Sequence, residues 1–196
     1  MPTGVALRDV RTQLFDAAER VLLRDGAAAL TSRAVTTEAG CAKGVLHRHF
    51  TDFDAFLAEL VLDRVARTDT LLATRDSGAV VDLLTDALVG LFTPVAVAMV
   101  GLITFRDGLR ARLRAAGQPG IPILTQGGAA ISARLRAERD AGRLAPGTDV
   151  DTLALTLLGT GHLLYAGRFD GRPERAEVRK VVSSVLGGAL VEPGSR

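Results

Sequence analysis

Apolar residues recur at three- and four-residue intervals along almost the whole chain, and this periodicity restricts the fold more than any other feature. Leu14, Ala18 and Val21 begin one such stripe, and comparable stripes follow it. An amphipathic helix buries a stripe of this spacing, whereas a half-buried strand would alternate apolar and polar residues. No alternating run of useful length occurs. The pattern therefore predicts an all-α fold.

Glycine and proline punctuate this pattern, so they divide the chain into expected helices. The first helix ends at Asp25-Gly26, and a helix that starts at Thr51 runs to about Leu72. The remaining large helices are expected at 79–92, 94–115, 122–141, 149–166 and 174–190. Two capping boxes are predicted, Thr51 with Asp54 and Thr148 with Asp151.

Composition restricts the function classes. The formal net charge of the 196 residues is only +2, so any DNA-binding surface must come from a local basic patch. Cys41 is the only cysteine, which excludes an internal disulfide and a cysteine-based zinc site. The sequence has no glycine-rich phosphate loop, no paired Glu-x-x-His motif and no serine with an evident base. We therefore predict no enzyme, no catalytic residue, no cofactor and no metal.

The stretch 87–105 carries no charge and is long enough to raise the question of a membrane span. Thr93-Pro94 interrupts it, with Thr93 as the expected N-cap and Pro94 at the first helical position. The two halves are each too short to cross a bilayer, so we interpret them as buried bundle helices. The N-terminus lacks a basic segment followed by an apolar run, which favours a cytoplasmic protein without membrane contact.

The most informative segment runs from about Leu30 to Phe56. It predicts a helix at 32–39, capped by Thr31 or Ser32, a tight turn at Gly40-Cys41-Ala42 and a second helix at 43–50. This is the layout of a helix-turn-helix, whose second helix enters the major groove of DNA. Leu46 and Phe50 can pack inward. A basic run alone is more often a solvated helix face, so the turn and the ending of this segment carry the argument.

Residues 39–50, Ala-Gly-Cys-Ala-Lys-Gly-Val-Leu-His-Arg-His-Phe, resemble the signature of the TetR family of transcriptional regulators. In that signature an Ala-Gly turn leads to a Gly-Leu-Tyr-x-His-Phe ending. The resemblance implies a three-helix DNA-binding domain at 1–50. It also implies a helical-bundle domain at 51–196 that binds a ligand and forms dimers.

Four positions depart from the family pattern. Ala42 stands where a serine or threonine cap is common, which removes a cap worth roughly 1 kcal/mol. Val45 replaces a common threonine, and His47 replaces the usual tyrosine. Phe53 replaces a lysine and so removes one expected phosphate contact. DNA binding is still expected, but the operator sequence does not follow from these residues.

The resemblance implies specific contacts with double-stranded DNA. Phosphate contacts would position the protein, and contacts with base edges would select the sequence. The implied DNA-binding residues are Ser32, Arg33, Thr36, Lys43, Gly44, His47, Arg48 and His49. His47 and His49 lie on different sides of a helix, so a metal pair is disfavoured. Cys41 is expected to fill a small apolar turn position, with a redox sensor as the alternative.

The resemblance also implies a homodimer through the last two helices and a small-molecule effector. The first helix carries the apolar stripe Val150, Leu153, Leu157, Gly161 and Leu164. The second carries Val178, Val181, Val182, Val185 and Ala189. Either stripe could instead close the core of one subunit. Candidate ligand-binding residues, most of which could be plain core, are Phe92, Met99, Leu102, Ile103, Phe105, Leu124, His162 and Tyr165.

The function implied is a repressor that a hydrophobic effector releases from a palindromic operator. An activator would use the same DNA-binding chemistry. The alternative from another class is a helical small-molecule-binding protein with a degenerate helix-turn-helix.

Overall fold

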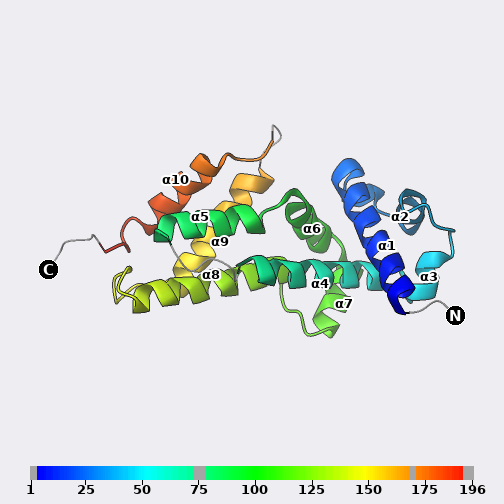
Figure 1. Cartoon of the computed structure of the whole chain (residues 1–196), viewed down its shortest axis with the longest axis horizontal. Helices are drawn as coiled ribbons and strands as arrows, with labels where there is room; N and C mark the ends of the chain where they lie inside the picture. The colour runs from blue at the N-terminus through cyan, green and yellow to red at the C-terminus, as the bar shows by residue number, and fades with distance from the viewer. Residues whose placement is uncertain (1–3, 73–77, 168–170, 192–196) are drawn as a thin grey trace. The chain divides into compact units, whose positions relative to one another are not determined.

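A computed structural model describes residues 4–72, 78–167 and 171–191 of the chain, and these fold as an all-α protein (Figure 1). The helices are α1 (Gly4–Asp25), the 3₁₀ turn η1 (Ala27–Ala29), α2 (Ser32–Glu38), α3 (Val45–His49), α4 (Phe53–Leu72), α5 (Val80–Leu91), α6 (Pro94–Phe105), α7 (Asp107–Ala115), α8 (Pro122–Asp140), α9 (Val150–Ala166) and α10 (Arg175–Leu186). Over these ranges the backbone forms no strand, only an isolated antiparallel bridge between Leu144 and Leu190. The predicted fold class is confirmed.

The chain forms two compact units. Unit 1 contains residues 1–64 and 94–122, and unit 2 contains residues 65–93 and 123–196. Helix α4 contributes residues to both. Each unit is a group of residues that pack together, and such a grouping does not assign a function. The division into a DNA-binding domain at 1–50 and a sensing domain at 51–196 therefore stays a prediction.

In unit 1, α1 ends where predicted, because Gly26 takes a left-handed φ of 80° directly after Asp25. Helix α2 begins with a side-chain cap: the Ala34 N–H donates to Thr31 Oγ1 at 3.1 Å. Its buried face carries Val35 and Thr36, and α2 packs against α1. Figure 1 shows α1, α2 and α3 grouped at the N-terminal end of the chain.

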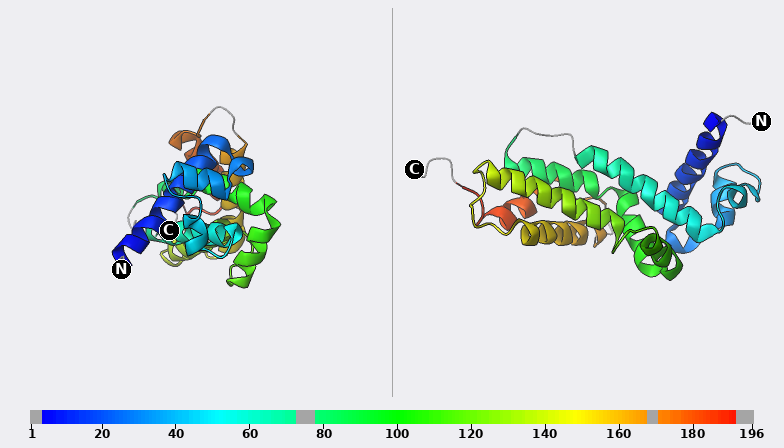
Figure 2. Two further views of the ribbon diagram at one scale, coloured as in Figure 1. Left: turned by 90° about the vertical axis from the view of Figure 1, so that its right-hand side faces the viewer. Right: turned by 90° about the horizontal axis from the view of Figure 1, so that it is seen from below.

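In unit 2, α10 packs against both α5 and α9, and Figure 2 shows α9 and α10 side by side. Small residues allow close helix approach. A Cβ on Gly127 of α8 would lie 2.6 Å from the Leu91 side chain of α5. At the other end of the unit, Ala145 N–H donates to Ala189 O at 2.9 Å. This bond joins the loop after α8 to the turn that follows α10.

The structure corrects three boundary predictions. The helix expected at 94–115 is two helices, because Arg106 takes an extended backbone between α6 and α7. Asp52, not Thr51, caps α4 through a bond from Ala55 N–H at 2.8 Å. Asp149, not Thr148, caps α9 through a bond from Thr152 N–H at 3.1 Å. In both cases a neighbouring carboxylate outcompetes the threonine for the same role.

Half of the residues in the two apolar stripes proposed for the dimer are buried in the core of unit 2. Val150, Leu157 and Gly161 of α9 are buried, and so are Val178 and Val182 of α10. For these residues the structure bears out the alternative, in which the stripes close the core of one subunit.

No single helix in the described ranges is both long and apolar enough to cross a bilayer. Only α5 and α6 taken together, as a bent pair, reach that composition.

Close packing at Gly161 leads to a stability prediction. A Cβ there would lie 2.7 Å from Cε2 of Phe92, and the Phe92 ring also contacts the rings of His162 and Tyr165. Gly161→Ala is therefore expected to lower the free energy of unfolding by about 1–3 kcal/mol, because overpacking forces the ring to move. Gly101→Ala is the control: its Cβ meets no atom within 4 Å, and loss of glycine from a helix should add about 0.5–1 kcal/mol. Urea unfolding of both variants tests this, and equal effects would contradict it.

Candidate nucleic-acid interface

Helices α2 and α3 and the turn between them form the predicted helix-turn-helix. Gly40 takes a φ of 64°, a left-handed conformation that other residues adopt only at an energetic cost. The turn then closes the end of α2: Gly40 N–H donates to Thr37 O at 3.1 Å and Cys41 N–H donates to Thr36 O at 2.9 Å. The Cys41 side chain is half-buried, with Sγ 3.6 Å from Ala39 O.

An aromatic cluster holds the inner face of α3. The Phe50 ring lies 6.1 Å from the Phe15 ring of α1 and 5.0 Å from the Phe56 ring of α4. Leu46 is fully buried beside this cluster. The Arg11 guanidinium lies 4.7 Å from the Phe50 ring centre and pairs with Glu59. Helices α1 and α4 therefore fix the orientation of α3, and no local sequence pattern indicated the part that Arg11 plays.

The outer face carries exposed groups. His47 and Arg48 are exposed on α3, and Lys43 is exposed in the turn before it. Arg33 is exposed on α2. Helix α3 begins at Val45 and not at Lys43 as predicted, and its N-cap is Gly44, which has no side chain to cap it. The cap position is therefore not Ala42, where the loss of a cap was expected. A Cβ on Gly44 would meet no atom within 4 Å, so packing inside the protein gives no reason for a glycine there.

The cations of this region fall into two groups. Arg11, Arg20 and Arg24 are paired with Glu59, Glu38 and Asp25. By contrast, Arg33, Lys43 and Arg48 have no ion pair or side-chain hydrogen bond with any residue in the described ranges. An unpaired cation can bind a phosphate without first losing an ion pair inside the protein. The free positive charge of the helix-turn-helix is thus concentrated on the α2–α3 surface.

Two of the predicted DNA-binding residues have half-buried side chains. A third, Thr36, is buried, so its predicted role in DNA binding is corrected. Ser32 and His49 are half-buried. Thr36 is only 2% exposed, and its hydroxyl donates within α2 to the carbonyl oxygens of Ser32 and Arg33, at 3.0 and 3.1 Å. Such a side chain cannot clamp a DNA backbone. Its methyl group packs inside, and its polar atom is already satisfied.

The start of α4 explains the unusual Phe53. Its ring stacks on Phe56 at 5.6 Å, and the Arg106 guanidinium lies 5.2 Å from the ring centre. Arg106 also pairs with Asp54. Phe53 therefore packs within unit 1 against Arg106, which lies between α6 and α7. The phenylalanine makes this internal contact at the position where the family pattern has a lysine that faces phosphate.

The predicted ligand-binding residues are divided between the two units. Phe92, His162 and Tyr165 lie together in unit 2, with the Phe92 ring 5.9 and 5.4 Å from the other two. Leu124 of that unit is half-buried. In unit 1, Met99, Leu102 and Ile103 are core residues of α6. The structure corrects Phe105, which is 89% exposed at the end of α6 and does not line a buried pocket.

The aromatic group in unit 2 contains polar atoms as well. His162 Nδ1 is buried without a hydrogen-bond partner in the described structure. Burial raises the pKa of the Tyr165 hydroxyl, and Arg172 partly opposes this shift. Buried polar atoms are normally hydrogen-bonded, so an unpartnered one calls for an explanation.

Comparison with known proteins identifies the N-terminal region. Residues 14–60 match the family described as bacterial regulatory proteins, tetR family. This range contains the end of α1, the helix-turn-helix and the start of α4. No curated protein sequence matches the chain.

Solved structures are similar in fold over nearly the whole length. A protein from Mesorhizobium loti assigned to the TetR family is 20% identical, with a TM-score of 0.69, covering 97% of this chain and 100% of its own. FadR from Bacillus subtilis, solved with stearoyl-CoA, is 16% identical with a TM-score of 0.68, covering 90% of this chain and 98% of its own.

A third similar structure is a protein from Saccharomonospora viridis assigned as a transcriptional regulator and solved with choline. It is 16% identical with a TM-score of 0.71, covering 94% of this chain and 100% of its own. These solved structures share the fold of the chain, and the family match covers the helix-turn-helix described above. Residues 14–60 are therefore similar to the tetR family of bacterial regulatory proteins, and over nearly its whole length the chain shares the fold of a solved structure assigned to that family.

Proposed function

We propose that the protein is a homodimeric repressor that binds a palindromic operator and is released from it by a small hydrophobic effector. The observation that carries this proposal is the unpaired set Arg33, Lys43 and Arg48 on the α2–α3 surface. Lys43, Gly44, His47 and Arg48 would reach the major groove or adjacent phosphates. Ser32, Arg33 and His49 would contact the backbone.

The dimer would form through α9 and α10. Leu155 and Leu163 are 69% and 73% exposed, and the exposed Gly159 lies between them at four-residue spacing. These three residues share one face of α9, opposite the face that packs in the core. A second copy that covers this face would remove two leucines from water. The small Gly159 would let the paired helices approach closely, and the two-fold axis of the dimer would match a palindromic operator.

The effector site would include the aromatic group of unit 2. Phe92, His162 and Tyr165 offer mostly apolar surface, and His162 Nδ1 offers a polar atom that lacks a partner. This combination suits a largely apolar ligand with one polar group. The similar structures hold ligands as different as choline and stearoyl-CoA, so the fold alone does not select the effector.

Helix α4 would couple the two activities, because residues 53–64 belong to unit 1 and the rest of the helix to unit 2. An effector that favours one position of α4 would change the spacing of the two recognition helices in the dimer. A regulator that binds an operator acts where the DNA is, so the protein would act in the cytoplasm.

Selection from a random DNA library tests the proposal. The full-length protein is expected to enrich a palindrome whose half-sites lie about one helical turn apart. Fluorescence anisotropy on that duplex then measures affinity, and hydrophobic compounds are screened for release. Enrichment of no motif would overturn operator recognition. A palindrome that no hydrophobic compound releases would overturn only the effector class.

A further inference from the structure

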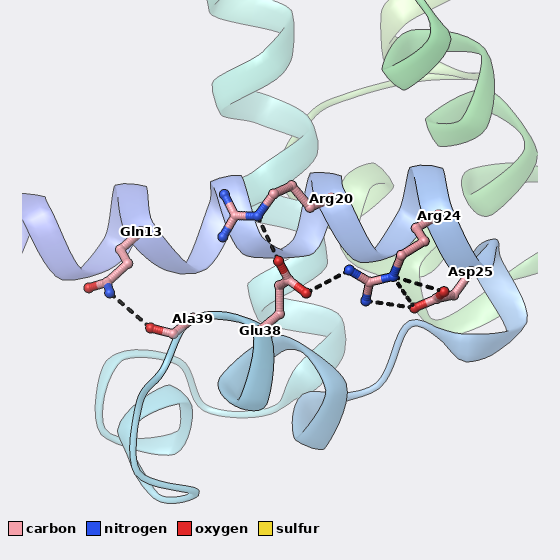
Figure 3. A network of polar contacts seen from close by, with 6 residues as sticks. All are labelled: Gln13, Arg20, Arg24, Asp25, Glu38 and Ala39. Atoms are coloured by element: carbon pink, nitrogen blue, oxygen red, sulfur yellow. Dashed lines mark hydrogen bonds and ion pairs between the residues drawn. The ribbon is translucent and has the colours of Figure 1, made fainter.

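A polar network joins α1 to the last residue of α2 and the residue that follows it (Figure 3). Glu38 accepts a hydrogen bond from Arg20 Nε at 2.8 Å and another from Arg24 Nη1 at 2.8 Å. Gln13 Nε2 donates to Ala39 O at 2.9 Å. Glu38 and Ala39 directly precede the Gly40 turn, so the network fixes the point from which the chain leads into α3.

The network also determines how much positive charge this surface presents. The side chains of Arg20 and Arg24 are 53% and 57% exposed, whereas Glu38 is only 21% exposed. Asp25 shares Arg24, but in the described ranges Glu38 is the acid that pairs with Arg20. The hydrogen bonds from the two arginines hold the pKa of Glu38 below its usual value, so the carboxylate stays ionised at neutral pH.

Glu38 lies next to a cation that the proposed function assigns to DNA. A shallow surface hollow is lined by Arg24, Arg33 and Glu38, together with Thr31, Ala34 and Thr37. Arg33 is exposed and unpaired, as described above. A phosphate held by Arg33 would therefore meet the Arg24–Glu38 pair in the same hollow.

We propose that Glu38 is a specificity-determining residue: it keeps Arg20 and Arg24 from contacting phosphates and positions the turn that leads into α3. An arginine released from Glu38 would contact phosphate on any sequence, whereas the position of the turn before α3 matters for the base contacts that only the operator provides. Loss of Glu38 would therefore raise the affinity for other DNA more than the affinity for the operator. By engaging two arginines internally, Glu38 leaves a larger share of the affinity to α3. This inference rests on the proposed operator recognition.

Glu38→Gln tests the inference because it keeps the shape of the side chain and removes its charge. The assay measures binding of the full-length protein to the selected duplex and to a scrambled duplex of the same composition, over a potassium chloride series. Affinity for the scrambled duplex is expected to rise about three- to tenfold, with a salt dependence steeper by about one phosphate contact. Affinity for the selected duplex should rise less or fall, so the ratio of the two affinities decreases.

Asp16→Asn is the matched control. Asp16 is exposed on α1 and has no ion pair or side-chain hydrogen bond in the described ranges, and the change removes the same charge without freeing an arginine. It should leave the salt dependence unchanged. Adding Arg20→Gln and Arg24→Gln to Glu38→Gln should abolish the gain in non-specific affinity.

The possible results separate the inference from the proposed function. If Glu38→Gln and Asp16→Asn give the same non-specific affinity and salt dependence, Glu38 has at most a structural role and the inference is wrong. If Glu38→Gln does not fold, Arg20→Gln decides: unchanged binding to the scrambled duplex supports the inference, and weakened binding shows that Arg20 already contacts phosphate. Failure of the wild type to select any duplex would instead contradict operator recognition.

Discussion

Replacing Arg48 with alanine is expected to raise the dissociation constant for the selected duplex about 10- to 100-fold, and Lys43→Ala should have an effect of similar size. Both side chains are exposed and have no internal partner in the described structure. Their loss therefore removes a DNA contact without breaking a contact that stabilises the fold. If either residue contacts phosphate, its variant should also lose about one unit of the logarithmic salt dependence.

Anisotropy on the selected and scrambled duplexes distinguishes the two roles. Removing a side chain that contacts a base edge should lower the affinity for the selected duplex more than the affinity for the scrambled duplex. Removing a side chain that contacts phosphate should lower both affinities equally. Arg114→Ala is the control, because Arg114 is an exposed arginine of α7 outside the helix-turn-helix. Equal losses in Arg114→Ala and Arg48→Ala would show that only net charge matters, and no loss at Lys43 or Arg48 would contradict the proposed surface.

Glutamate at both Leu155 and Leu163 is expected to prevent formation of the proposed dimer and to leave a monomer. The two leucines are 69% and 73% exposed, so the free subunit loses little when they are replaced. In a dimer the four introduced carboxylates would be buried near one another without partners, which is strongly unfavourable. Affinity for the palindrome should fall about 100-fold or more, because the two half-sites would no longer be bound as one unit.

Sedimentation velocity measures the first effect, and anisotropy on a full palindrome and on a half-site measures the second. The half-site affinity should stay unchanged in the double variant. Leu23→Glu provides the control for oligomeric state, since Leu23 is an exposed leucine of α1. A double variant that still sediments as a dimer would exclude this face of α9 as the interface.

The sequence predicted the helices well where a residue with a strong local preference ends them. Gly26 and Gly40, with φ values of 80° and 64°, stop α1 and shape the turn before α3 in the expected places. The break at Arg106 was missed because arginine is a good helix former, and the contacts that favour the break, with Phe53 and Asp54, are distant in sequence. Cap positions were wrong by one residue where threonine and aspartate are neighbours.

The outward-facing residues of the candidate site could be predicted from the sequence, but the internal hydrogen bonds and ion pairs around them could not. The outward positions of Lys43, His47 and Arg48 followed from the spacing of Leu46 and Phe50. Thr36 was misassigned because a polar residue type does not reveal that its hydroxyl bonds to its own helix. The pairing of Glu38 with Arg20 and Arg24 joins residues 14 to 18 positions apart, and no local pattern reports such a contact.

The packing of Phe53 against Arg106 also restricts how this sequence can diverge. The lysine common in the family at position 53 could not return by a single substitution without loss, because it would place a second cation beside the Arg106 guanidinium and remove the ring beneath it. Positions 53 and 106 are therefore expected to covary among close relatives. A lineage that regained a phosphate-binding lysine at position 53 would also have to replace the arginine at the corner between α6 and α7.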